Sequence, residues 1–271
     1  MRRRHAPGPR HGRRIVLVAV TLVLAALGSA MGLWAVSGRT DSTRARSVST
    51  PTASSTPVPE TPRPDSAQDS AVRLQLEQMR AIPVPSPERA LRDRIPAEAR
   101  LHPDLYAAQF VSALLTQDFR RPRSQLLSWV AAEAVTTNEP LVVGLVPVEL
   151  RDRLAVFSVT EESDGPGSSP IPSPAEWTRL GALDAYTTVA DVRVSEPLAW
   201  SNAVDAGRIT DPGITARQVT ATVTLHTTDS SRPSTTRYSV SLTADFEGPP
   251  TRPSWGFVNV VLYTSLKEGA S

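Results

Sequence analysis

The sequence predicts an α+β domain held outside a membrane by one N-terminal helix. Three observations lead to this prediction. The stretch Ile15 to Val36 carries no charge over 22 residues, apolar residues recur at helical spacing between about residues 101 and 157, and residues alternate with a period of two from Tyr186 to Thr264. Helices followed by an antiparallel meander give a sheet with one face covered and one face polar.

The uncharged stretch, residues 15–36, is predicted to be a single transmembrane helix. At about 1.5 Å per residue it crosses the roughly 30 Å hydrocarbon core of a bilayer. Six arginines and no acid precede it, so the positive-inside rule places residues 1–14 in the cytoplasm and the C-terminal part outside the cell membrane. A cleaved signal peptide is the alternative, but its apolar region is shorter, and Gly28-Ser29-Ala30 lies inside the run.

The charge balance argues against direct nucleic-acid binding by the exported part. The chain has 29 basic and 27 acidic residues, for a net charge of +2. Removing the six arginines of the tail leaves 23 basic residues and a net charge of −4. No broad basic surface is therefore expected outside the membrane.

Residues 37–100 are expected to connect the anchor to the folded domain. Residues 37–70 are rich in Ser, Thr and Pro and poor in large apolar side chains, which predicts a stalk without a core. In residues 71–100, a short helix precedes a proline-rich connector. Val72, Leu76, Met79 and Ile82 form its apolar stripe, which indicates a helix docked loosely on the domain, a juxtamembrane helix or a contact for a partner.

The folded domain is predicted to cover residues 101–271 and to begin with helices. A helix entered at His102-Pro103-Asp104 is expected to run to about Phe119. Ser124 is the expected cap of a second helix, and Ser173 with Glu176 form a capping box for a later one. The predicted inward side of the second helix comprises Leu126, Leu127, Val130, Ala131 and Ala134. Further short helices are expected over residues 148–157 and 198–206, the latter with Trp200 and Val204 inward.

Four strands are predicted in the second half of the domain, at about residues 186–194, 219–226, 238–246 and 255–264. The apolar face of the first is assigned to Tyr186, Thr188, Ala190, Val192 and Val194. The polar face of the next two carries Thr220, Thr222, Thr224, Ser239, Ser241 and Thr243. The last strand is apolar on both faces, which predicts a place at the centre of the sheet or under the helices.

No catalytic, cofactor-binding or metal-binding residue is assigned. The absence of cysteine excludes disulfides and thiolate chemistry, and the four histidines, His5, His11, His102 and His226, are isolated in the sequence. Asp191 and Asp245 fall on polar strand faces and are interpreted as solvated residues. An apolar pocket with an inward aspartate would instead indicate a general base. The aromatic residues Trp177, Trp200, Trp255, Tyr186, Tyr238 and Tyr263 are interpreted as core residues.

The segments HPDLYAAQFVSALLTQDFRRPRSQLLSWVAAEA, PAEWTRL, DPGITARQVTATVTL and WGFVNVVLYT follow a basic tail, one span and a stalk. This pattern resembles the membrane-anchored, nuclear-transport-factor-2-like subunits of bacterial conjugation and type IV secretion channels, and especially the TcpC-like conjugal transfer proteins. The resemblance implies a cone-like domain with helices on a curved antiparallel sheet. It also implies a non-catalytic protein that self-associates and contacts other channel subunits. Members can carry two tandem domains of this fold, and one is expected here.

Three functions follow as expectations. The first is a structural subunit of a conjugative or secretion channel, without cofactor or small-molecule substrate. The second is an accessory scaffold of a lipid-import or cell-wall system, and the third is an extracytoplasmic ligand-binding or isomerase-like protein. For the first, the candidate contact surfaces are the Thr/Ser strand face and the helix at residues 71–82; the Thr/Ser face is otherwise simply solvated.

Overall fold

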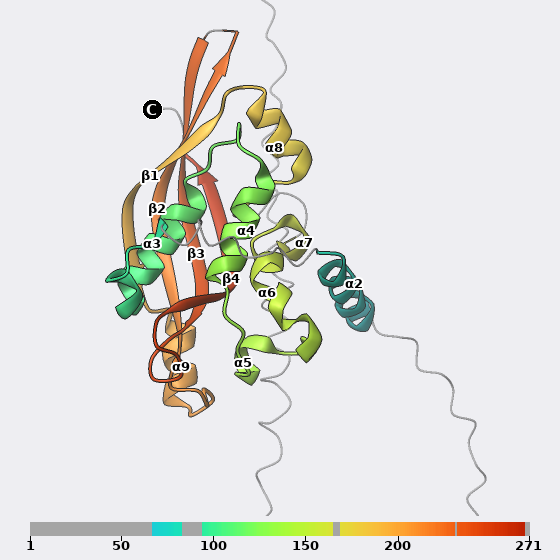
Figure 1. The fold of residues 1–271 in the computed structure, drawn as a ribbon, viewed down its shortest axis with the longest axis vertical. Helices are drawn as coiled ribbons and strands as arrows, with labels where there is room; N and C mark the ends of the chain where they lie inside the picture. Colours follow the sequence, from blue (N-terminus) through green and yellow to red (C-terminus); the bar gives the residue numbers. More distant parts are fainter. Residues whose placement is uncertain (1–66, 83–93, 165–168, 231, 269–271) are drawn as a thin grey trace, which may run out of the picture. The chain divides into compact units, whose positions relative to one another are not determined.

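The computed structural model describes residues 67–82, 94–164, 169–230 and 232–268 (Figure 1). The expected cytoplasmic tail, transmembrane helix and nearly all of the stalk lie outside the described residues. Among the helices described, none is both long and apolar enough to cross a membrane.

The described part of the chain is an α+β domain in which helices precede an antiparallel sheet, as predicted. The sheet has four strands in the order β1-β2-β3-β4, and each strand pairs with its neighbour in sequence. The strands are β1 (Tyr186–Ser195), β2 (Ile214–Asp229), β3 (Arg232–Glu247) and β4 (Gly256–Lys267). The longer helices are α3 (Pro103–Leu115), α4 (Arg123–Glu133) and α6 (Arg151–Ser158). Shorter helices are η2 (Ala99–Leu101), α5 (Pro140–Val143), η3 (Val148–Leu150), α7 (Glu161–Asp164), α8 (Pro174–Gly181) and α9 (Leu198–Asp205).

The core lies between the helices and one face of the sheet (Figure 1). Its centre is aromatic: the ring of Phe110 stacks on Phe257 at 4.2 Å and on Trp129 at 5.3 Å between centroids. Ile95 and Ala99, which precede the predicted start at residue 101, also belong to this core. Burial of these large side chains supplies most of the driving force for folding in a chain without disulfides.

β4 lies at an edge of the sheet, so its expected central position is wrong. The alternative, a place under the helices, holds for its first half. The backbone N–H of Val260 donates to Ser158 Oγ of α6 at 2.9 Å, and Phe257 bridges to Ala134 after α4. These contacts explain the apolar character of both faces there and protect that part of the edge.

Because of a β-bulge, the predicted apolar face of β1 is correct only for the residues after the bulge. The register of β1 against β2 shifts between Ala190 and Arg193, where Asp191 has a φ of +54°. The inserted residue reverses the side to which side chains point. Val192 and Val194 therefore pack on the core as predicted, whereas Tyr186, Thr188 and Ala190 are exposed. Thr187 and Val189 face inward in their place.

The helix starts were predicted with mixed success. Pro103 opens α3, and Ser173 Oγ accepts the N–H of Glu176 at 3.1 Å at the start of α8, as expected. The expected cap by Ser124 is wrong, because α4 begins at Arg123 after Pro122. α3 ends at Leu115 because the chain then becomes extended, and Asp118 bridges to Tyr186 of β1. In α9, Trp200 is buried as expected, but Val204 is exposed.

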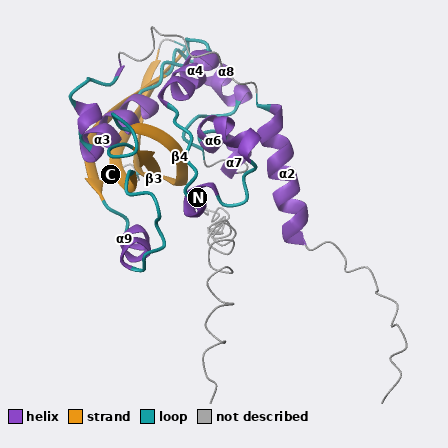
Figure 2. Cartoon of the chain, turned by 60° about the horizontal axis from the view of Figure 1, so that its bottom comes forward, coloured by secondary structure: helices purple, strands orange, loops and turns teal. Residues whose placement is uncertain are grey.

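The helix preceding the domain, α2 (Ala67–Ala81), begins earlier than the predicted residue 71 and lies beside α6 and α7 (Figure 2). Its apolar stripe faces the domain. Met79 is 3% exposed and packs on Leu150 and Phe157, and Leu76 and Ile82 flank this contact. The stripe is thus occupied within the chain, which supports the interpretation of a docked helix over that of a free apolar contact surface.

Candidate functional site

The sheet has a second face, opposite the helices, and this face carries the predicted hydroxyl residues. Register places Thr220 beside Ser241 and Thr222 beside Ser239 on neighbouring strands. Val219 and Leu242, with the opposite parity, lie in the core. The predicted division of β2 and β3 into an apolar and a polar face is therefore confirmed. We call Thr220, Thr222, Thr224, Ser239, Ser241 and Thr243 the Thr/Ser face.

The Thr/Ser face is open and hollowed, and it continues onto both outer strands. A shallow hollow of about 440 Å³ is lined by four of its hydroxyl residues together with Asp191 and Arg193 of β1 and Leu266 of β4. Leu266 is 71% exposed and Leu262 is 45% exposed. Both lie on this face, because Leu266 pairs with Ser239 and Leu262 with Thr243. The surface therefore combines hydroxyl groups with exposed leucines.

Hydrogen bonds order some of these hydroxyls. Gln218 Nε2 donates to Ser241 Oγ at 2.9 Å, and Ser239 Oγ donates to Glu268 Oε1 at 3.0 Å. Such cross-strand bonds hold the side chains in one arrangement, which lowers the entropic cost of binding a partner.

The same face is closed at its other end by α9. Trp200 of α9 packs on Ile214 and Ala216 of β2, with Val142 and Ile209 beside them. Asp245 lies at this end, because it pairs with Ala216 across β2 and β3.

Asp245 is 4% exposed, so the prediction of a solvated side chain is wrong although its face was assigned correctly. Burial raises the pKa of its carboxyl group to about 7. Across β4 it pairs with Asn259, whose buried Oδ1 has no hydrogen-bond partner in the described structure. Asp245 lines neither of the two hollows described here. Asp191, by contrast, is exposed at the bulge, as expected.

The described histidines and the aromatic residues considered as pocket candidates lie in packing contacts or on the surface. His226 stacks on Tyr186 at 4.6 Å, and its Nε2 lies 3.0 Å from Thr188 Oγ1. His102 is exposed at the start of α3. The tryptophans Trp177, Trp200 and Trp255 are buried as predicted, and Tyr238 and Tyr263 are partly buried against the core. Tyr186 is exposed and was wrongly assigned to the core.

Sequence reasoning did not identify the buried acids that hold the domain together. Glu133 accepts from Arg100 Nη1 and Nη2 at 2.8 and 2.7 Å and from Tyr106 Oη at 3.0 Å. Glu139 accepts from the N–H groups of Thr210 and Asp211 at 2.8 and 2.9 Å, and these bonds hold its pKa below the usual value against the opposing effect of burial. The sequence feature that could have identified Glu133 is a charged residue on the apolar side of α4, the side that also carries Trp129 and Val130.

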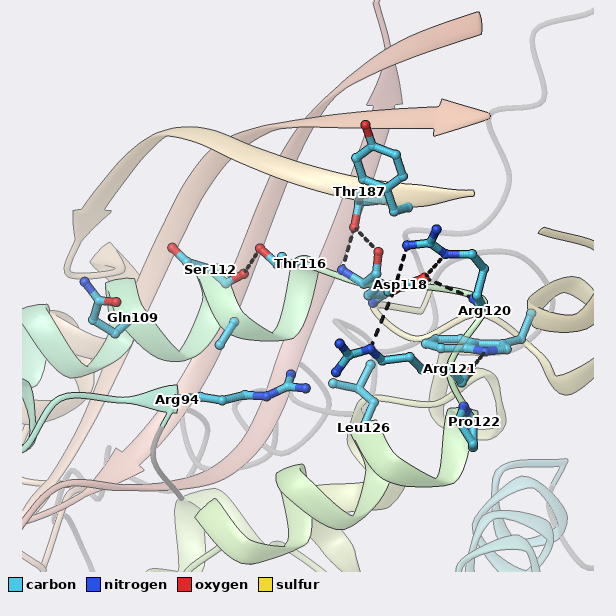
Figure 3. Close-up of a pocket in the computed structure, with 14 residues that line it drawn as sticks. Arg94, Gln109, Ser112, Thr116, Asp118, Arg120, Arg121, Pro122, Leu126 and Thr187 are labelled. Atoms are coloured by element: carbon cyan, nitrogen blue, oxygen red, sulfur yellow. Dashed lines mark hydrogen bonds and ion pairs between the residues drawn. The ribbon is translucent and has the colours of Figure 1, made fainter. Parts of the chain in front are cut away.

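A second hollow of about 530 Å³ lies between the C-terminal half of α3, the α3–α4 loop and the start of β1 (Figure 3). Its charged residues are Arg94, Asp118, Arg120 and Arg121, and we call it the arginine groove. Trp177, Leu126 and Tyr186 add apolar surface to its lining. The sequence analysis did not identify this groove, because its residues come from segments that only the fold brings together.

Among the described residues, no group of three or more acidic or histidine side chains is arranged to hold a metal ion. The arrangement instead offers two open surfaces for binding: the Thr/Ser face and the arginine groove. In comparisons with known proteins, the sequence matches no family model, and neither curated proteins nor solved structures give a significant match.

Proposed function

We propose that the chain is a non-catalytic, membrane-anchored assembly subunit of a conjugative DNA-transfer channel of the type IV secretion kind. In this proposal, residues 15–36 span the membrane and a nuclear-transport-factor-2-like domain lies outside it. The fold is compatible with the proposal, since helices cover one face of a four-stranded antiparallel meander. The protein would act by binding copies of itself and other channel subunits.

The observation that carries the proposal is the open Thr/Ser face with its two exposed leucines. Monomeric domains usually cover or interrupt such surfaces, and clustered exposed apolar side chains mark sites of protein contact. Here α9 covers one end of the face, while Leu262 and Leu266 on β4 remain exposed. Hydroxyl and aliphatic groups side by side suit a protein partner, because interfaces combine an apolar centre with hydrogen bonds at the rim.

The acids of the domain support a structural role more than a catalytic one. Glu133 and Glu247 are paired with Arg100 and Arg252, respectively. The carboxyl group with the raised pKa, Asp245, lies under the α9 end of the sheet and lines neither hollow. An isomerase-like site requires such a group at a substrate cavity, so the assembly function is the better fit.

The proposal is tested by site-specific photo-crosslinking in the native membrane. A photoreactive amino acid at Thr220, which is exposed on the Thr/Ser face, should crosslink to a second copy or to a channel subunit. The same amino acid at Thr178, exposed on α8, is the matched control and should give far fewer crosslinks.

The crosslinked partners decide between the functions. Coupling ATPase, channel subunits and self-crosslinks support the proposal. Recovery of lipid-import or cell-wall enzymes would replace it with the accessory-scaffold function. Equal crosslinking from Thr220 and Thr178 would refute the Thr/Ser face as the contact surface.

A further inference from the structure

The lining of the arginine groove carries more positive than negative charge. Asp118 is its one acid, and Arg120 binds it through two contacts, Nε to Oδ1 at 2.8 Å and Nη2 to Oδ2 at 2.9 Å. Arg121 Nε lies 3.6 Å from the same carboxylate. Three arginines and one aspartate thus give the lining a formal charge of +2, and Asp184, outside the lining, acts in addition on Arg120.

Arg94 has no acidic partner within the described part of the chain. Its guanidinium lies over the ring of Trp129, with Cζ 5.4 Å from the ring centroid. Burial lowers the pKa of Arg94, and the positive charge of Arg121 lowers it further. In Figure 3 the two side chains extend toward the same part of the groove. Arg121 shares the carboxylate of Asp118 with Arg120, so the Arg94 and Arg121 guanidinium groups still repel each other, and an anion bound between them would reduce that repulsion.

The α3–α4 loop, which carries Arg120 and Arg121, is held in place by contacts with α8 and β1. Trp177 Nε1 donates to the backbone O of Arg121 at 2.9 Å, and Thr187 Oγ1 accepts the N–H of Gln117 at 2.7 Å. Phe119 is buried and packs edge-on against Trp177 at 4.8 Å. The groove is therefore built in advance, and a ligand does not have to order the loop.

We propose that the arginine groove binds a phosphate-bearing ligand, with Arg94 and Arg121 contacting the phosphate oxygens. Guanidinium groups match phosphate geometry through paired hydrogen bonds, and two of them call for more than a single negative charge. Trp177, Tyr186 and Leu126 line the groove beside the arginines and offer a surface for an organic substituent. Free phosphates and phosphate esters share this chemistry. The inference concerns a different surface from the Thr/Ser face and does not depend on the assembly function.

The test is calorimetric titration of the full-length protein in an uncharged detergent at low ionic strength. Pyrophosphate represents the free anion and glycerol 3-phosphate the ester, and acetate serves as the control anion. Saturable binding of either phosphate supports the proposal, and the tighter ligand identifies the source. Arg94→Gln and Arg121→Gln should each weaken that binding by roughly tenfold, since each removes a charge-assisted contact.

Arg232→Gln removes the same charge from the exposed start of β3 and should leave binding unchanged. Unaltered thermal melting shows that each variant is folded. The proposal is overturned if neither phosphate binds saturably, or if all three variants bind as the parent does. Tighter, arginine-dependent binding of an acidic peptide such as hexaglutamate would also overturn it in favour of a peptide ligand.

Discussion

Asp245 and Asn259 pair across β3 and β4, and the buried Oδ1 of Asn259 has no hydrogen-bond partner in the described part of the chain. Burial alone raises the pKa of Asp245 to about 7, with no charged group contributing. Below about pH 7 such a carboxyl group is mostly protonated, and in that form it is able to donate to the unpaired Oδ1 of Asn259.

This pair predicts that the domain loses stability as pH rises. In the unfolded chain an aspartate titrates near about 3.9. Its contribution is therefore fully present below that pH and declines as pH rises toward about 7, because the unfolded state releases its proton first. The loss approaches about 4 kcal/mol at its upper limit, from the size of the shift.

Asp245→Asn should remove this dependence, because the amide cannot ionise and its NH₂ group is able to donate to Asn259. In urea unfolding, we expect the variant to be more stable than the parent at about pH 8 and to vary less between about pH 4 and pH 8. Asp191→Asn, the same change at an exposed position, is the control. Equal pH slopes for the parent and Asp245→Asn would show that Asp245 is not the titrating group.

The ion pair between Arg100 and Glu133 is a second case in which burial determines the effect of a substitution on stability. The side chain of Glu133 is 0% exposed and that of Arg100 is 21% exposed. Arg100→Leu should lower the free energy of unfolding by about 3 kcal/mol, because it leaves a carboxylate buried with Tyr106 as its remaining neutral donor. The double variant Arg100→Leu/Glu133→Leu should recover much of this loss in denaturant unfolding. A double variant less stable than Arg100→Leu would argue that the pair stabilises the fold beyond mutual compensation.

At the scale of elements, sequence reasoning succeeded where a regular pattern runs without interruption. β2 and β3 alternate continuously, so their core and polar faces were predicted correctly. β1 contains a bulge at Asp191, and one inserted residue reverses the assignment of the residues before it. No local sequence pattern predicts that bulge, because the bulge depends on how β1 pairs with β2.

The misassigned residues have the same kind of cause. Asp245 lies on the expected face, but α9 covers that end of the sheet. The position of α9 is set by the turn that connects it to β2, which strand periodicity does not report. In the arginine groove, Arg94 precedes α3 in the sequence and Arg121 follows it. Trp177 lies more than fifty residues further along the sequence. Periodicity identifies faces of single elements, whereas these sites arise where elements meet.

The docking of α2 gives a prediction at this scale. Met79 is the buried residue through which the helix contacts Leu150 and Phe157. Met79→Ala should loosen the helix, because it removes apolar contacts that α2 alone cannot replace. Hydrogen exchange of the α2 amides should accelerate, while exchange in α6 stays unchanged. Leu74→Ala, at a 60% exposed position on the same helix, should change neither. Unaltered exchange in Met79→Ala would show that other contacts hold α2.

At the scale of the whole domain, the two faces of the sheet serve different purposes. One face is buried under α3, α4 and α6 and holds the aromatic core. The other is covered by α9 at one end and is otherwise open, and Leu262 and Leu266 are exposed on it. A change on the open face should therefore alter association without altering folding, which separates the two roles experimentally.

Leu266→Asp tests this separation. A carboxylate in place of an exposed leucine should cost little in folding, within about 0.5 kcal/mol, because surface substitutions away from packed groups are nearly neutral. In a buried interface the same charge would be desolvated without a partner, so self-crosslinking in the membrane should fall severalfold. Leu145→Asp, at a position 79% exposed outside the Thr/Ser face, is the matched control and should crosslink as the parent does. If Leu266→Asp and Leu145→Asp crosslink equally well, the Thr/Ser face is not where copies of the chain meet, and the covered and open ends of the sheet need another explanation.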